Sequence, residues 1–276
     1  MATTPLTPTL SVQLYTVRDQ LAADLDGTLA RLAAMGLTNV EAFDFVSRAP
    51  ELAESFRANG LVARTGHATM LSDEIRVGDD VFPVASQDEV FAAAKTLGLE
   101  IVIDAFVAPE RWLDEEAVAD TAARLNRAAE RAADHGLRVG YHNHTQEFAA
   151  SFGGRSAFEV FADQLDESVA LEVDLFWAAT AKQDVVGLLG RLGERVQALH
   201  VKDGIIGPDP FVGETGPHDA QDLDQRPAGQ GEVPLLDYLA AAPSARFAII
   251  EFDTYPGDIF AAVNESVDFL TARGIR

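Results

Sequence analysis

Acidic and imidazole side chains gather at the ends of four consecutive apolar stretches of the chain. A carboxylate buried at the end of an apolar run such as FAIIE is costly unless a cation or several hydrogen-bond donors compensate it. Because consecutive stretches repeat the pattern, we expect a shared cation. The side chains are His142, His144 and Glu147 in LRVGYHNHTQEF, Glu172 and Asp174 in LEVDLFW, His200 and Lys202 in LHVKD, and Glu251 and Asp253 in IIEFD.

The donor types in these stretches suit a divalent metal ion. Glu147, Asp174, His200 and Glu251 would offer three carboxylates and one imidazole. This set fits Mn²⁺, Mg²⁺ or Co²⁺ better than a thiolate-preferring structural zinc site, and it would leave coordination positions for water or for vicinal oxygens of a substrate. The expected cofactor is one divalent metal ion, with manganese preferred and magnesium, cobalt and zinc as alternatives.

Two histidines flank the first of these carboxylates. His142 and His144 lie on one side of an extended strand, because successive side chains alternate, whereas Asn143 faces the other way. We expect both histidines to contact substrate or to orient Glu147, since metal-bound carboxylates commonly need such partners. A purely structural role for the two histidines stays open.

Other polar residues are candidates for substrate contact. Lys202 follows His200 by two residues and should reach a substrate oxygen, unless it pairs with Asp174 or Asp203. Glu41 and His67 follow or end earlier apolar runs and could bind substrate hydroxyl groups, with a loop-fixing role as the alternative. Glu172 is expected to be a structural partner, because it lies two residues before Asp174 and therefore deeper.

Short β-rich runs recur along the chain, separated by Ala-, Leu-, Arg- and Glu-rich segments with helical spacing. Several of these segments end in a glycine that can form a left-handed cap: LARLAAMGL, LAESFRANGL, VFAAAKTLGL and LNRAAERAADHGL. The runs are LSVQLY (10–15), NVEAF (39–43), LVARTG (61–66), IVIDAF (101–106), LRVGYH (137–142), VALEVDLF (169–176), VQALHV (196–201) and FAIIEF (247–252).

Strands that alternate with helices predict parallel strands joined by right-handed crossovers. Eight such units predict an α/β fold, a closed (β/α)₈ TIM barrel, as a single domain over residues 1–276. An open doubly wound sheet is the runner-up, but no G-x-G-x-x-G follows the first strand. The carboxyl ends of barrel strands form one face, so the polar strand ends would meet there.

Two Gly-, Pro- and Asp-rich segments, 71–87 and 202–234, interrupt the repeat and follow strands. In a barrel they are expected to be long loops at the active-site face. Within the second segment, the backbone N–H groups of GQG (229–231) could hold an anion ahead of a helix, although two glycines are a weak signal.

Composition limits the function classes. With 44 acidic residues against 21 Lys plus Arg, the chain has a formal net charge of −23, which repels nucleic acid and anionic lipid surfaces. There is no Cys, so disulfides, thiolate metal sites and Cys nucleophiles are excluded. No signal-peptide pattern or long apolar run occurs, so we expect a cytoplasmic protein without membrane contact.

Six motifs together resemble the sugar isomerase/epimerase branch of the xylose isomerase-like TIM barrels, and the match runs over essentially the whole chain. Any single motif is weak, but the ordered set is fairly specific. The motifs are SVQLYTVRD (11–19), YHNHTQEF (141–148), VDLFWA (173–178), LHVKD (199–203), GQGEVP (229–234) and IIEFD (249–253).

The resemblance implies a mechanism and a ligand set. Glu147, Asp174, His200 and Glu251 would be the metal ligands, and Glu147 and Glu251 would double as the catalytic acid–base pair. The implied activity is isomerisation or epimerisation of a small sugar or keto-sugar, by proton transfer next to a carbonyl through an enediolate. Barrels of this kind often associate, so the resemblance also allows a homo-oligomer.

One position departs from the ketose epimerases of this family. Those enzymes place a His three residues after the sixth-strand Asp, where this chain has Trp177. An aromatic face can stack on a sugar, so Trp177 is expected either to line the substrate pocket or to pack against the barrel.

Two alternatives to an isomerase stay open. A metal-dependent lyase or hydratase acting on 3-keto-glycosides would explain the extra histidines, with His142 or His144 as proton carrier. A sugar-binding barrel without catalysis is the other alternative. Nucleases, which HNH by itself suggests, need a cationic groove that this chain does not supply.

Overall fold

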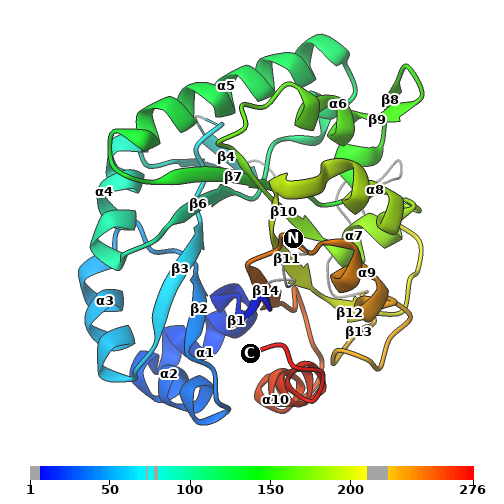
Figure 1. Ribbon diagram of the computed structural model, residues 1–276. Coiled ribbons are helices and arrows are strands. Elements are labelled where there is room, and N and C mark those ends of the chain that lie inside the picture. The colour runs from blue at the N-terminus through cyan, green and yellow to red at the C-terminus, as the bar shows by residue number, and fades with distance from the viewer. Residues whose placement is uncertain (1–6, 73, 78–79, 210–222) are drawn as a thin grey trace, which may run out of the picture.

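Eight parallel strands form the centre of the molecule, and helices surround them (Figure 1). The computed structural model describes residues 7–72, 74–77, 80–209 and 223–276. In sheet order the strands are β1 (Thr9–Val12), β14 (Phe247–Ile250), β11 (Val196–Val201), β10 (Ala170–Asp174), β7 (Arg138–His142), β6 (Ile101–Asp104), β3 (Val62–His67) and β2 (Asn39–Ala42).

The sheet is nearly closed into a barrel. All neighbouring strands pair in parallel, and β1 lies next to β14 although the two strands are at opposite ends of the chain. A parallel bridge between Gln13 and Glu41 joins the remaining edges, just beyond β1 and within β2. Each predicted run overlaps one barrel strand, so the (β/α)₈ prediction is confirmed and the open doubly wound alternative is wrong.

Helices connect the strands on the outside of the barrel. Gly36, Gly60, Gly98 and Gly136, which close the four predicted helix–glycine repeats, all have a positive φ, as left-handed helix caps require. The helices are α1 (Arg18–Ala23), α2 (Leu25–Ala34), α3 (Ala49–Ala58), α4 (Gln87–Leu97), α5 (Glu115–Ala133), α6 (Ala157–Asp163), α7 (Leu175–Thr180), α8 (Val185–Leu192), α9 (Leu235–Ala241) and α10 (Ile259–Thr271). None of these helices is both long and apolar enough to cross a bilayer.

The barrel interior has an apolar layer and a polar layer. A separate buried cluster of Ile101, Ile103, Ala170, Ala198, Phe247 and Ile249 fills the barrel toward the strand starts. Side chains that point inward recur every second residue, so the next inward positions after Ala170, Ala198 and Ile249 are Glu172, His200 and Glu251. The charged residues therefore sit above an apolar floor, at the carboxyl ends of the strands.

Each of the two segments predicted as long loops contains a short β-hairpin. The first segment contains β4 (Glu74–Val77) paired with β5 (Asp80–Pro83), and the second contains β12 (Asp203–Gly204) paired with β13 (Gln225–Arg226). Part of the second segment, 210–222, lies outside the described residues. A third hairpin, β8 (Ser151–Phe152) with β9 (Arg155–Ser156), follows β7. The role of the loops in covering an active site stays a prediction.

The GQG backbone does hold an anion, but the anion belongs to the same chain. The carboxylate of Asp203 accepts hydrogen bonds from the backbone N–H groups of Gly229 at 2.8 Å and Gly231 at 3.0 Å. It also accepts from Gly204 at 2.8 Å and Val233 at 3.1 Å. These N–H groups are therefore engaged within the chain, and the expectation that they are available to an anionic ligand is wrong.

Candidate metal centre

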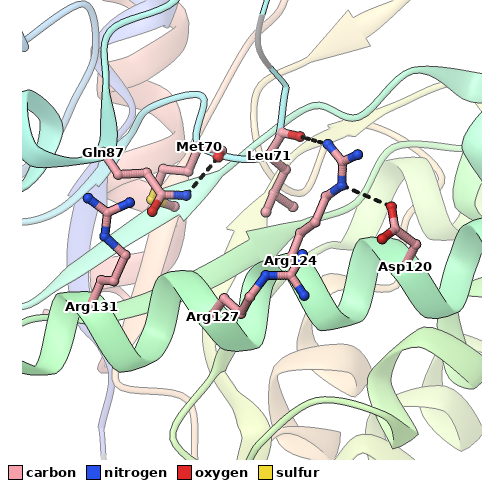
Figure 2. A pocket seen from close by; sticks show the side chains of 7 residues that line it. All are labelled: Met70, Leu71, Gln87, Asp120, Arg124, Arg127 and Arg131. Carbon is pink, nitrogen blue, oxygen red and sulfur yellow. Dashed lines mark hydrogen bonds and ion pairs between the residues drawn. The ribbon is translucent and has the colours of Figure 1, made fainter.

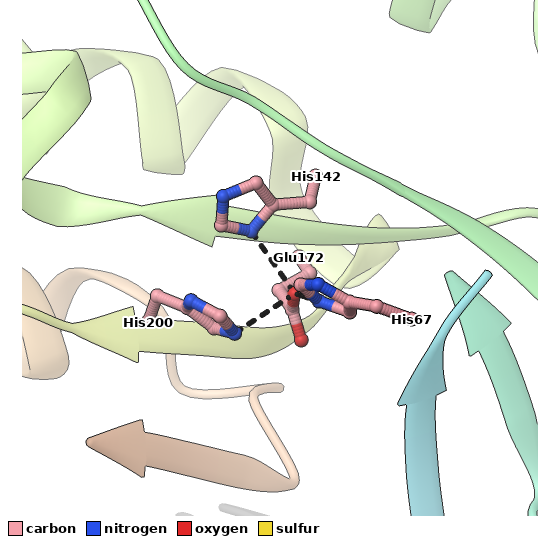
Figure 3. A group of neighbouring side chains, drawn as sticks. All are labelled: His67, His142, Glu172 and His200. Atoms are coloured by element: carbon pink, nitrogen blue, oxygen red, sulfur yellow. Dashed lines mark hydrogen bonds and ion pairs between the residues drawn. The ribbon is translucent and has the colours of Figure 1, made fainter. Parts of the chain in front are cut away.

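One carboxylate oxygen at the centre of the barrel faces three imidazole rings (Figure 3). Oε1 of Glu172 lies 2.7 Å from Nε2 of His67 and 3.0 Å from Nδ1 of His142. The same oxygen lies 3.0 Å from Nε2 of His200. These side chains come from β3, β7, β10 and β11, so the barrel brings together residues that are distant in sequence.

A second group uses the other nitrogens of two of these rings. Nδ1 of His200 lies 2.7 Å from Oε2 of Glu251, and Nε2 of His142 lies 3.9 Å from Oδ2 of Asp174. In each group the potential ligand atoms all lie within 4.8 Å of one another. His142 and His200 therefore stand between the two groups, which is the geometry of histidines that bind a metal through one nitrogen and a carboxylate through the other.

Lys202 neutralises part of the second group. Its Nζ lies 3.1 Å from Asp174, 2.9 Å from Glu251 and 2.7 Å from Asp253, and the side chain is buried. The Lys202 ammonium also lies over the ring of Trp177, with 5.3 Å between Nζ and the ring centroid. The ion pair with Asp174, expected as the alternative to substrate contact, is therefore present.

The three histidines of the cluster have pKa values shifted in different directions by their surroundings. Burial opposes protonation of His67, but the carboxylates of Glu41 and Glu172 outweigh it and raise its pKa to about 10. His200 has its pKa raised well above its usual value in the same way, by Glu172 and Glu251 against burial. For His142, burial and the neighbouring His200 lower the pKa well below its usual value.

Glu41 is a further carboxylate that contacts histidines of the first group. Its Oε1 accepts from Gln13 at 2.7 Å and lies 2.7 Å from Nε2 of His200 and 3.1 Å from His67. Burial alone would raise the pKa of Glu41, but the charge of His67 and the hydrogen bond from His200 hold it below its usual value. Glu41 therefore contacts two histidines of the cluster, and neither the expected sugar contact nor the loop-fixing role is tested by these contacts.

Asp174 presents one carboxylate oxygen to the cluster. β10 ends at this residue, and its Oδ1 caps α7 by accepting from the backbone N–H of Trp177 at 2.8 Å. Oδ2 has no hydrogen-bond partner among the described residues, although the Lys202 ammonium lies nearby. Burial raises the pKa of Asp174 to about 6 against the effect of Lys202 and His200. The oxygen is positioned to bind a cation.

The donor chemistry of this second group fits a divalent cation. Two carboxylates and two imidazoles converge, all buried, and one oxygen among them lacks a hydrogen bond. Imidazole suits zinc and later transition metals, and carboxylate suits manganese and magnesium, so the mixed set accepts Mn²⁺, Co²⁺ or Zn²⁺ better than Mg²⁺. A cation there would compete with Lys202 for Glu251, while Lys202 would keep its partner Asp253.

Glu147 is in neither of these groups. It lies in a short 3₁₀ turn after β7 (Gln146–Phe148), where its Oε1 accepts from the Tyr141 hydroxyl at 2.8 Å and its Oε2 accepts from the backbone N–H of His144 at 2.9 Å. Burial raises the pKa of Glu147 to about 7 in spite of these donors. The structure brings together Asp174, His200 and Glu251 as expected, with His142 as the fourth donor.

A cavity of about 390 Å³ opens above the second group. His67, His142, His144, Trp177 and Glu251 line it, and all of them were candidates from the sequence, whereas Glu41 and Lys202 are not among its lining residues. For His144, burial and the charge of Lys202 lower the pKa to about 4, so its ring is neutral at pH 7.

Sequence reasoning missed most of the aromatic wall of this cavity. Tyr15, Phe43 and Phe106 line it together with Asp253. Tyr15 and Phe106 come shortly after β1 and β6, and Phe43 directly follows β2. An aromatic residue just beyond a barrel strand was the signal that could have found them, because such residues lie at the carboxyl face.

Comparisons with known proteins place the chain among one group of barrels. A family model described as xylose isomerase-like TIM barrel matches residues 29–272. No curated protein sequence matches the chain. Among solved structures, a sugar phosphate isomerase/epimerase from Parabacteroides distasonis ATCC 8503 is 19% identical, with 99% of this chain and 98% of that chain covered and a TM-score of 0.76.

Two further structures have similar folds and different names. The probable 3-DHS dehydratase AsbF of Bacillus anthracis, involved in petrobactin synthesis, is 12% identical, covers 95% of this chain and 98% of its own, and has a TM-score of 0.69. The IOLI protein with a bound zinc atom is 17% identical, covers 97% of this chain and 99% of its own, and has a TM-score of 0.68. At these identities the similarity shows a shared fold.

Proposed function

The chain belongs to the xylose isomerase-like TIM barrel family, and on that premise we propose that it is a divalent-metal-dependent enzyme that isomerises or epimerises a sugar. The observation that carries the proposal is the group of His142, Asp174, His200 and Glu251, of which His142 and Glu251 line an aromatic-walled cavity. A relative of the same fold, the IOLI protein, has a bound zinc atom, which supports a metal at such a site.

We assign the metal to the second group, which consists of His142, Asp174, His200 and Glu251, and we assign a positioning role to Glu172. In the first group, Oε1 of Glu172 already faces three imidazole nitrogens, whereas its Oε2 has no hydrogen-bond partner among the described residues. The second group also has an oxygen without a hydrogen bond, on Asp174, and its Glu251 lines the cavity, whereas Glu172 does not. Glu172 would then hold the second nitrogens of His142 and His200, as carboxylates commonly do behind metal-binding histidines.

Proton transfer next to a carbonyl needs a base that faces the substrate. A bound divalent cation would supply Lewis-acid polarisation of the carbonyl. The neutral ring of His144 and the carboxylate of Glu251 both line the cavity and are the proposed acid–base pair. Glu147 accepts the backbone N–H of His144, so its proposed role becomes one of positioning that histidine. Trp177 and Phe43 offer faces on which a sugar ring can stack.

The position of His144 also favours a second function, elimination from a 3-keto-glycoside. That reaction needs a proton carrier at one face of the sugar, and an imidazole that is neutral at pH 7 fits it. The probable dehydratase with this fold is an elimination enzyme by name, which supports the alternative. Release of an aglycone from a keto-glycoside in the presence of Mn²⁺, without exchange of a ketose C–H proton, would favour elimination.

Metal content and solvent exchange test the proposed isomerase. The purified protein is expected to contain about one Mn, Co or Zn per chain by elemental analysis and to incorporate deuterium from D₂O into a ketose. Asp174→Asn should lose the metal and the exchange, whereas Asp237→Asn, which changes an exposed carboxylate on α9, should keep both. Wild-type protein without a stoichiometric metal would leave a sugar-binding barrel as the better description.

A further inference from the structure

A second cavity, of about 340 Å³, lies outside the barrel against α5 (Figure 2). Arg124, Arg127 and Arg131 of this helix line it together with Asp120. Its other wall is Gln87 at the start of α4 and the segment Met70–Leu71 that follows β3. It shares no lining residue with the cavity above the metal centre. We call it the arginine cavity.

The arginine cavity is a local exception to the charge of the molecule. The chain has 21 Lys plus Arg against 44 Asp plus Glu, yet three guanidinium groups and one carboxylate line this cavity. The arginines are spaced by three and four residues, so they lie on one face of α5. Like charges at this spacing repel one another and destabilise the helix slightly, and a bound anion would remove that cost.

The outer arginines are held in place, and the central one is not. Arg124 lies 2.9 Å from Asp120 and donates to the Leu71 carbonyl at 3.3 Å, and Arg131 lies 2.7 Å from Asp88. Asp120 is shared, because Arg111 also lies 2.6 Å from it. Among the described residues, no hydrogen bond or ion pair engages Arg127.

The opposite wall is fixed by the barrel. The Gln87 amide donates to the Met70 carbonyl at 3.0 Å. The backbone N–H groups of Met70 and Leu71 donate to the buried carboxylate of Asp104 at 2.6 and 2.8 Å. A ligand would therefore meet a wall that is already fixed, and Arg127 is the side chain that has to be ordered on binding.

We propose that the arginine cavity binds a phosphate group, either as free phosphate or on a small ester. A guanidinium presents planar N–H donors that match two oxygens of an oxyanion, and phosphate can use Arg127 together with a neighbouring arginine. A polyanion is a poor ligand, because the net charge of −23 repels it everywhere else on the surface. The ligand class is thus a small phosphate.

Calorimetric titration with inorganic phosphate tests the proposal. It is done at low ionic strength and in excess EDTA, which keeps phosphate from binding through a metal ion. Wild-type protein should show saturable binding at one site per chain, and Arg127→Gln should weaken it about 10-fold. Arg57→Gln removes an exposed arginine of α3 and should leave the affinity unchanged. Asp174→Asn should also leave it unchanged, because Asp174 belongs to the candidate metal centre and does not line the arginine cavity.

A second titration, with glycerol 3-phosphate, distinguishes the two sources of phosphate. Tighter binding than that of inorganic phosphate would assign the cavity to a phosphate ester, and weaker binding would assign it to the free ion. The proposal is overturned if wild-type protein shows no saturable phosphate binding. It is also overturned if Arg127→Gln binds phosphate as well as wild type does, or if Asp174→Asn removes the binding.

Discussion

The candidate centre depends on two histidines that each serve two carboxylates. His200 faces Glu172 and Glu41 with one nitrogen and Glu251 with the other, and His142 lies between Glu172 and Asp174. A hydrogen bond to one ring nitrogen fixes the orientation of the imidazole, so the other nitrogen points toward the second group. The buried carboxylates thereby convert flexible side chains into a rigid donor set.

The turn after β7 explains why sequence reasoning placed Glu147 differently from the structure. Tyr141 and His142 are neighbours on a strand and point to opposite sides. His142 points into the barrel, whereas Tyr141 packs against Trp112 and Phe161 outside it. Glu147 bonds to the Tyr141 hydroxyl and so follows the outward side chain. A turn beyond the strand end decides this, and the sequence pattern does not specify turns of that kind.

Glu147 makes a pH-dependent contribution to stability. Its pKa is raised from an ordinary value of 4.5 to about 7 by burial, so the folded state holds a proton that the unfolded state releases between these values. Stability from this group is therefore fully present below pH 4.5 and is lost as the pH rises to 7. Glu147→Gln cannot titrate. Between pH 5 and pH 8, wild type should lose about 2 kcal/mol of unfolding free energy relative to the variant.

Urea denaturation of both proteins in EDTA at pH 5, 6, 7 and 8 measures this difference. The comparison between the two proteins cancels the titration of all other groups. A difference that stays constant across the pH range, or that grows in favour of wild type at pH 8, would contradict the raised pKa.

At the scale of elements, the sequence predicted the barrel well and its loops poorly. The strands between 10 and 252 were found because buried apolar runs alternate with helices that end in glycine. The end of β10 was misplaced, since LF after Asp174 reads as strand but begins α7. The hairpin of β12 and β13 was missed, because it depends on long-range bonds such as those of Asp203 and not on an apolar pattern.

Gly231 shows how tightly the Asp203 loop is built. A Cβ at this position would overlap the Asp203 carboxylate and the backbone N and O of Gly204. Backbone atoms of a paired strand cannot move aside at low cost, so Gly231→Ala should lower the unfolding free energy by about 2–4 kcal/mol. Gly190 in α8 is the matched control, with no atom within 4 Å of the added Cβ. Gly190→Ala should be neutral or stabilise by up to about 1 kcal/mol.

Urea denaturation curves of the two alanine variants measure these changes. Equal stability of Gly231→Ala and wild type would show that the loop can open around Asp203. In that case the hydrogen bonds from the GQG backbone to the Asp203 carboxylate would contribute little to the stability of the fold.

At the scale of the whole molecule, negative charge is concentrated both on the surface and inside the barrel. Glu41, Glu172, Asp174 and Glu251 are buried together, and Lys202, His67 and His200, with pKa values raised by these carboxylates, offset part of their charge. A fold with a net charge of −23 is further weakened by self-repulsion. A divalent cation in the candidate centre would offset buried negative charge that the neighbouring cations leave uncompensated.

Binding of Mn²⁺ should therefore stabilise the folded protein as a unit. At a concentration 100 times its Kd, a ligand specific for the folded state adds about 2.7 kcal/mol, which corresponds to roughly 5–10 °C in Tm for a domain of this size. The Tm is measured in EDTA and then across a MnCl₂ titration, with NaCl of equal ionic strength to account for screening.

Glu172→Gln loosens His142 and His200 without removing a proposed ligand, so it should shift the titration midpoint to about 10- to 100-fold higher Mn²⁺. A rise in Tm that NaCl reproduces, or a midpoint unchanged in Glu172→Gln, would mean that the cation acts on the surface charge and not through the barrel.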